Sequence, residues 1–223
     1  MELQSIVDSN ILFHIFLTTE IKNKEELLKL QSKENIVLLN PELILNLTHL
    51  SIALEKSVVQ SKKKRLSRPI KRDVVYYTCE SGKSEYCWQL HYNLILKEKE
   101  KTEKIENEKV EDSTCLTNNI TNSSTNNTNL LNFYVIVISS CKEETKQNEF
   151  SLNSLTEETY DDKKLKQGLE KLLSCRVVEA ENFSDYSNIK RIIKDFNLTE
   201  DESKTNSGIL GAVYNRLSLK DLK

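Results

Sequence analysis

The sequence of 223 residues lacks the short motifs that mark many enzymes and nucleotide-binding proteins. It contains no GxxxxGK[ST] loop, no GxGxxG, no HExxH and no GxSxG. With only four glycines, a glycine-lined cradle for phosphate groups is difficult to build. We therefore expect a protein that is not an enzyme and that uses no cofactor. An enzyme with an unrecognised carboxylate site stays open, because acidic residues are abundant and no motif selects a pair among them.

Long apolar runs and metal-type cysteine spacings are also absent. No apolar stretch approaches the ~20 residues that span a bilayer, and the first ten residues lack the pattern of a secretory signal. The cysteines are Cys79, Cys87, Cys115, Cys141 and Cys175. They form no CxxC pair, and the cysteines and histidines do not make up the complete ligand pattern of a zinc site. We expect free thiols, no metal site, no membrane partner, and a cytoplasmic and nuclear location.

The hydrophobic pattern alternates between strand and helix periods. Strands are predicted at residues 11–17, 73–79, 132–139 and 175–180, and the third, being almost continuously apolar, is expected to be buried on both faces. Helices are predicted near residues 23–34, from Leu47 to about Lys62, and over 85–97, 161–174, 186–196 and the C-terminal segment. Residues expected to face inward include Leu165, Leu169, Leu172, Leu173, Ile189, Ile192, Ile193 and Phe196. This order predicts an α/β or α+β domain with one central sheet.

A polar segment interrupts this pattern at residues 98–129. Six of the twelve residues from 118 to 129 are asparagine. So polar a tract buries too little apolar surface to offset an ordering cost of about 1–2 kcal/mol per residue. We expect a disordered insertion in a single domain that comprises residues 1–97 and 130–223.

Positive charge is concentrated just after the predicted helix that ends near Lys62, although the net charge of the chain is only −2. The seven basic residues of this segment are Lys62, Lys63, Lys64, Arg65, Arg68, Lys71 and Arg72. Three interpretations compete: a solvated turn, a nuclear import signal of the KKKR type, and a surface that binds nucleic acid. In the third, clustered cations would neutralise phosphates and release counterions without reading bases.

The C-terminal helix has two different sides. A helical projection places Ile209, Leu210, Val213, Tyr214 and Leu217 on one side, and Gly208, Gly211, Ala212 and Asn215 on the other. The apolar side suits a core, and the small-residue side would let another element approach closely. The helix either packs only on its own domain or also faces a partner.

Several segments, in their order along the chain, resemble a known family. They are LLNPELIL (38–45), LSIALEKSVVQSKKK (50–64), SRPIKRDVVYYTCES (67–81), NFYVIVI (132–138) and GILGAVYNRLSLKDL (208–222). Together they resemble the smallest core subunit of the KEOPS (EKC) complex, the TPRKB-like (PRPK-binding) family. Arg68, Ile70 and Asp73 match the last arginine, the leucine and the acid of the family's basic segment. Leu66, Pro69 and the polar insertion depart from the family pattern.

The resemblance implies a mixed α/β domain with a mainly antiparallel sheet flanked by helices. It also implies a non-catalytic subunit that binds the PRPK-type kinase or ATPase. This subunit would help recruit tRNA by its 3′ CCA end for threonylcarbamoyladenosine modification next to the anticodon. The candidate kinase-interface residues are Gly208, Ile209, Gly211, Ala212, Asn215 and Arg216, and the candidate tRNA contacts are the seven basic residues. A purely kinase-regulatory partner without RNA contact is the alternative, besides the unrecognised enzyme.

Overall fold

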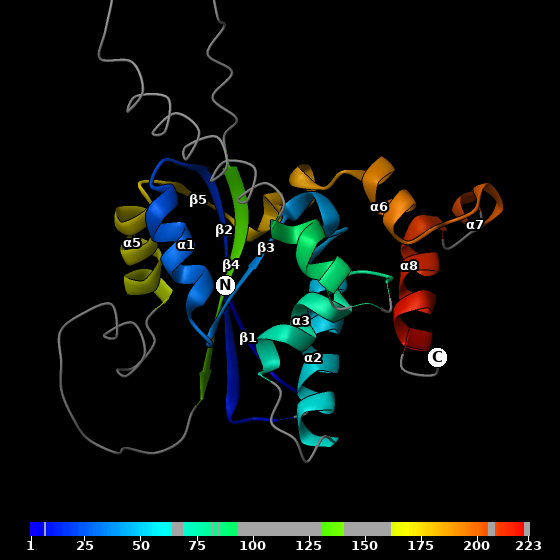
Figure 1. The fold of residues 1–223 in the computed structure, drawn as a ribbon, viewed down its shortest axis with the longest axis horizontal. Coiled ribbons are helices and arrows are strands. Elements are labelled where there is room, and N and C mark those ends of the chain that lie inside the picture. Colours follow the sequence, from blue (N-terminus) through cyan, green and yellow to red (C-terminus); the bar gives the residue numbers. More distant parts are fainter. Residues whose placement is uncertain are drawn as a thin grey trace, which may run out of the picture.

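The computed structural model describes residues 1–6, 8–63, 69–81, 83, 85–92, 131–140, 162–204 and 208–220. Within these ranges five strands form one antiparallel sheet (Figure 1). The strands are β1 (Glu2–Gln4), β2 (Ile11–Ile21), β3 (Ile36–Leu39), β4 (Leu131–Ser140) and β5 (Arg176–Val178). The order is β1-β2-β4-β3, and β5 also pairs with β2. The predicted mixed α/β (α+β) class with a mainly antiparallel sheet is confirmed.

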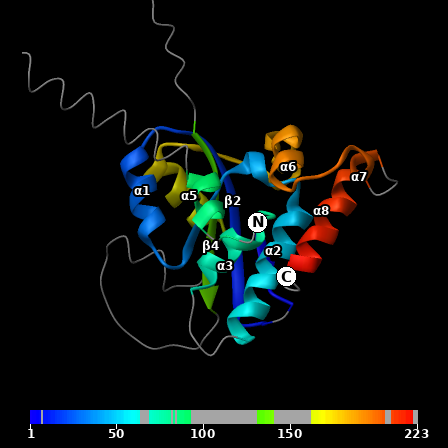
Figure 2. The ribbon, with the colours of Figure 1, turned by 45° about the vertical axis from the view of Figure 1, so that its right-hand side comes forward.

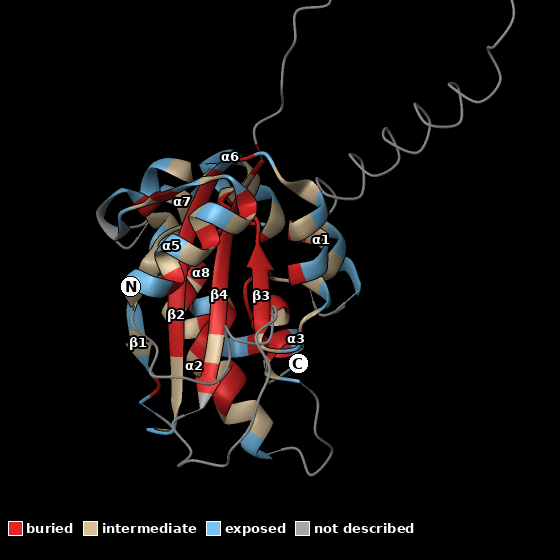
Figure 3. Ribbon diagram, turned by 90° about the vertical axis from the view of Figure 1, so that its left-hand side faces the viewer, coloured by how far each residue is buried: buried red, intermediate tan, exposed pale blue. Residues whose placement is uncertain are grey.

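Helices cover both faces of the sheet. The helices α1 (Lys24–Ser32) and α5 (Asp162–Leu173) lie on one face, and α2 (Leu47–Lys63) and α3 (Ile70–Tyr77) lie on the other (Figure 1). Side chains along β2 alternate between the two faces of the sheet. Phe13 and Ile15 pack in the core under α2 and α3, and Phe16 packs in the core under α1 and α5. The central strands are buried along most of their length (Figure 3), so the prediction of a doubly covered strand at β4 is confirmed.

The strand predicted at residues 73–79 is wrong, because α3 occupies most of this segment as a helix. The run of valine and tyrosine suggested a strand through β propensity. Lys71, Val74, Val75 and Thr78 are buried at the i, i+3, i+4, i+7 spacing of a helix, and Asp73, Tyr77 and Cys79 are buried as well. Pro69 precedes the helix at its N-cap. The helix spans only eight residues, and its valines and tyrosines favour a strand, so its periodicity is difficult to recognise in the sequence.

The C-terminal helices form a third layer against α2. They are α6 (Ile189–Asp195), α7 (Glu200–Lys204) and α8 (Gly208–Leu219), and α8 runs beside α2 (Figure 2). Short 3-10 helices precede this layer at η1 (Pro41–Leu43) and η3 (Ala180–Tyr186). The separate apolar cluster of this layer includes Ile192, Phe196, Val213 and Leu217. Ile189, predicted to be buried, is 42% exposed instead.

Two lysines join this layer to the rest of the fold. The ammonium group of Lys220 donates to the carbonyl oxygens of Tyr76 and Cys79 at the C-terminal end of α3. Lys56 on α2 donates to the carbonyl of Leu217 at the end of α8. Each lysine thus satisfies carbonyls that the end of a helix leaves without a partner inside that helix.

The predicted polar insertion at residues 98–129 lies outside the described residues, so the proposed division of the domain stays a prediction. Residues 85–92 are helical, as expected for the first part of the helix predicted at 85–97. Cys79, Cys87 and Cys175 are free thiols, and Cys115 and Cys141 lie outside the described ranges. None of the helices in the described ranges is both long enough and apolar enough to cross a bilayer.

Candidate functional site

A gap in one edge of the sheet opens into a cavity with polar groups around it. Because β4 occupies one edge of β2, both β1 and β5 pair with the opposite edge. The pairing with β1 ends at His14 and the pairing with β5 begins at Leu17, so Ile15 and Phe16 lie between the two short strands. A cavity of about 360 Å³ opens here, and Asp162, Lys166 and Glu179 are among its lining residues.

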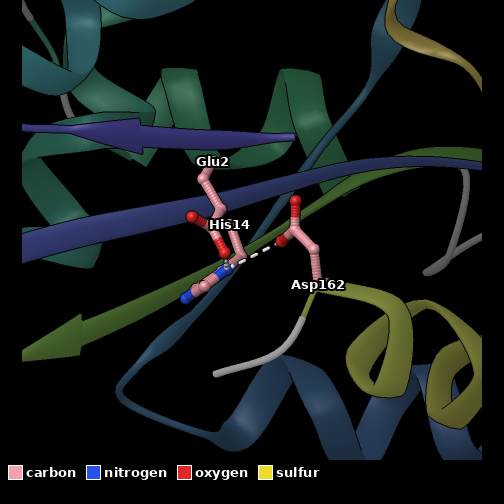
Figure 4. Close-up of side chains that lie close together, drawn as sticks. All are labelled: Glu2, His14 and Asp162. Atoms are coloured by element: carbon pink, nitrogen blue, oxygen red, sulfur yellow. Dashed lines mark hydrogen bonds and ion pairs between the residues drawn. The ribbon is translucent and has the colours of Figure 1, made fainter. Parts of the chain in front are cut away.

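Three ionisable side chains converge beside this cavity (Figure 4). His14 comes from β2, Glu2 from β1, and Asp162 is the first residue of α5. The Nδ1 atom of His14 lies 2.8 Å from Oδ1 of Asp162 and 3.8 Å from Oε1 of Glu2. The side chain of His14 has no exposed surface, whereas that of Glu2 is 45% exposed. The site therefore has a buried base and a carboxylate open to solvent.

Local structure explains how these residues meet. Glu2 and His14 are directly paired in the register of β1 and β2, so their side chains lie on the same face of the sheet. Asp162 occupies the first turn of α5, where the helix dipole favours a negative charge. The amino group of Met1 also lies 3.1 Å from Oδ2 of Asp162. Two carboxylates and an imidazole thus share one small volume.

The other nitrogen of His14 faces β4. Its Nε2 atom is 3.4 Å from Oγ of Ser139, and that hydroxyl donates to the carbonyl of Leu12 at 3.2 Å. In space His14 lies between Ser139 and Asp162, as the histidine of a serine-hydrolase triad lies between its serine and its aspartate. Ser139 is only 4% exposed and its proton is directed to Leu12. It is therefore not placed to act as a nucleophile, and the arrangement does not favour hydrolysis by this route.

The basic segment divides into different environments. Lys63 at the end of α2 and Arg72 on α3 are exposed, and Lys62 pairs with Asp8 at 3.1 Å. Lys71 is only 7% exposed. Its ammonium group donates to the carbonyls of Gln31 and Lys33 at the C-terminal end of α1, so the prediction of Lys71 as a tRNA contact is wrong. Lys64, Arg65 and Arg68 lie outside the described residues.

The candidate kinase-interface residues differ in how far they are exposed. Ala212 is 7% exposed and packs in the same cluster as Val213, so its prediction as a surface residue is wrong. Asn215 is exposed, and Gly208, Ile209 and Gly211 are half-buried. Arg216 pairs with Glu202 on α7 at 2.8 Å and therefore holds α7 against α8. The projection was correct for Asn215 but placed Ala212 on the wrong side, and Leu210, predicted on the apolar side, is 40% exposed.

The cluster of Glu2, His14 and Asp162 escaped the sequence analysis. Its members are separated by 12 and 148 positions, so no local spacing connects all three. Of these contacts, only the pairing of Glu2 with His14 could have been inferred from the sequence, through the residues that connect their strands. The polar residues Asp8, Ser9 and Asn10 between the two strands are typical of a tight connection in a hairpin.

Comparison with known proteins adds no family. No protein-family model matches the chain, and no curated protein matches it. The resemblance to the small KEOPS subunit therefore remains a prediction from the segments given above.

Proposed function

We propose that the chain is a non-catalytic subunit of a KEOPS-type complex. In this role it binds a PRPK-type kinase or ATPase through the outward side of α8 and helps to recruit tRNA for threonylcarbamoyladenosine modification. The observation that carries the proposal is the outward side of α8, which is distinct from the side that packs on the domain.

The outward side of α8 combines small and apolar residues. In a helical projection Gly211 and Ser218 lie near its centre, Leu210 lies at one margin, and Asn215 and Leu219 lie toward the other. Leu210 is 40% exposed and Leu219 is 52% exposed. Exposed leucines that flank small residues offer a partner both apolar surface and close approach, which are the features of a buried interface core.

The exposed part of the basic segment supports the tRNA role. Lys63 and Arg72 lie on two different helices that flank residues 64–68, and both are exposed. A cationic surface of this kind contributes to binding of phosphates in a sequence-independent, salt-dependent manner. Because the ammonium group of Lys71 bonds carbonyls at the end of α1, the candidate tRNA contacts among the described residues are Lys62, Lys63 and Arg72.

The first test is co-elution of the chain with a PRPK-type kinase. Asn215→Arg places a bulky charge on the outward side of α8, so we expect at least tenfold weaker binding, with the melting temperature of the isolated chain unchanged. Gln167→Arg, an equivalent change at an exposed position of α5, is the matched control and should bind normally. Co-elution of folded Asn215→Arg at wild-type strength would reject this interface.

The second test separates recruitment of tRNA from pure regulation of the kinase. The double variant Lys63→Glu, Arg72→Glu should weaken tRNA binding by the assembled complex at low salt, and the difference should shrink as salt rises. If the assembled double variant binds tRNA as the wild type does, the kinase-regulatory alternative is the better description.

A further inference from the structure

We propose that Glu2, His14 and Asp162 form a binding site for one divalent transition-metal ion of the Zn²⁺ class. This inference is independent of the proposed KEOPS role. It rests on the hydrogen bonds of His14, on the geometry of the donor atoms, and on the elements that these residues join.

The surroundings of His14 leave its Nδ1 atom and Asp162 able to share a metal ion in place of a proton. The hydroxyl of Ser139 donates to the carbonyl of Leu12 and lies 3.4 Å from Nε2 of His14, so its oxygen is placed to accept from Nε2–H when that nitrogen carries the proton. A neutral imidazole protonated on Nε2 presents a lone pair at Nδ1. In this tautomer the lone pair faces a carboxylate oxygen at 2.8 Å, and a metal ion bound between the two atoms would take the place of the proton that joins them in the other tautomer.

The spacing of the donor atoms suits a metal ion. With metal–ligand bonds of about 2.1 Å, the ligands of a tetrahedral zinc site lie roughly 3.4 Å apart. The distance from Nδ1 to Asp162 is 2.8 Å, that of a hydrogen bond, and the distance to Glu2 is 3.8 Å, so the first pair would separate slightly and the second would approach on binding an ion. All three donor atoms lie within 4.8 Å of one another. A small movement of the half-exposed Glu2 side chain would complete the coordination.

The surroundings also resemble those of a metal-binding histidine. Such a histidine usually donates its second N–H to an oxygen that fixes the orientation of the ring. Ser139 supplies that oxygen here, and it is itself held by the carbonyl of Leu12. One imidazole with two carboxylates suits zinc and related ions. Three protein donors leave a coordination position, and Asp162 also lines the 360 Å³ cavity, where water or a small anion could complete the shell.

A bound ion would add a link between three elements of the fold. It would tie the three-residue strand β1 and the first turn of α5 to the central strand β2. We therefore expect Zn²⁺ to raise the melting temperature of the chain, because a ligand that binds only the folded state stabilises it.

The test is equilibrium dialysis of the full chain against Zn²⁺, with Co²⁺ as a spectroscopic probe. We expect one Zn²⁺ per chain, and at least about tenfold weaker binding in both Glu2→Gln and Asp162→Asn. Glu179→Gln, which changes another carboxylate lining the same cavity, is the control and should bind as the wild type does. The Co²⁺ spectrum should lack thiolate charge-transfer bands, because the site contains no cysteine.

Several results would overturn the proposal. They are the absence of Zn²⁺ binding by the wild type, wild-type affinity in both ligand variants, and a thiolate spectrum that locates the ion at the cysteines. Circular dichroism of Glu2→Gln verifies that the variant is folded, which is expected because this side chain is 45% exposed.

Discussion

Lys71 lies against the carboxyl end of α1, although its sequence context placed it among the candidate tRNA contacts. Its ammonium group bonds two carbonyls there and lies 5.9 Å from the centre of the Trp88 ring. Burial lowers the pKa of Lys71 to about 8, so the charged form still predominates at neutral pH. The residue is therefore a cap for α1, and its charge serves the fold.

Replacement of Lys71 by methionine should destabilise the chain by about 2 kcal/mol, because two carbonyls lose a charged donor. The tRNA affinity of a folded complex should not change. Urea unfolding at pH 7 measures the first effect. Arg72→Met is the neighbouring control: its side chain is exposed, so we expect a change within about 0.5 kcal/mol. Equal losses in the two variants would contradict the capping role.

The sequence shows where basic residues are concentrated, but it does not show which of them are exposed. Lys71 and Arg72 are adjacent in the chain, and one is buried while the other is exposed, because successive residues of a helix point about 100° apart. The orientation of α3 on the sheet decides which of them points inward. That orientation depends on contacts with α1, which lies 40 residues earlier in the sequence.

At the scale of elements, strong periodicity was a reliable guide and local propensity was not. The strands β2 and β4 and the helices α2, α5 and α8 were predicted because their patterns extend over many residues. The helix α3 was missed because eight residues give a short pattern and its valines favour a strand. Its position over the sheet, where Val74 and Val75 reach the core, overrides that preference.

The two glycines of α8 should respond in opposite ways to alanine. Gly208 begins the helix with a φ of +54°, a conformation that alanine adopts only with strain, so Gly208→Ala should destabilise the chain by about 1 kcal/mol. Gly211 lies inside the helix on its outward side, so Gly211→Ala should stabilise it by up to about 1 kcal/mol. Thermal melts of both variants measure the difference. A stabilising Gly208→Ala would show that the N-terminal turn of α8 has been misassigned.

For the whole molecule, two buried histidines predict a loss of stability in acid. His91 accepts a hydrogen bond from the backbone N–H of Asn40, and His49 accepts one from Leu45. Burial is the main cause that lowers the pKa of His49 to about 4 and that of His91 to about 3. Between about pH 6.5 and pH 4 the unfolded chain therefore binds protons that the folded chain does not. The free energy of unfolding should therefore fall as the pH is lowered to 4, by about 3 kcal/mol for each histidine.

Urea unfolding at pH 7, 6, 5 and 4 measures this dependence. Asp195 acts in the opposite direction, because burial raises its pKa to about 6, so the folded state takes up this proton first as the pH falls. Asp195→Asn removes the opposing contribution and should steepen the decline below pH 6. A stability that is constant from pH 7 to pH 4 in both proteins would show that the histidines titrate normally in the folded state.

The two lysines that join the C-terminal layer to α2 and α3 have a consequence for biosynthesis. The carbonyl of Cys79 leaves the ribosome 141 residues before Lys220, the residue that bonds it. Lys56 likewise precedes its acceptor at Leu217 by 161 residues. These groups therefore stay hydrated in the nascent chain until the segment from Leu217 to Lys220 has emerged. A chaperone that binds nascent chains would find α2 and α3 incompletely covered throughout that interval, and the emergence of α8 would complete their cover.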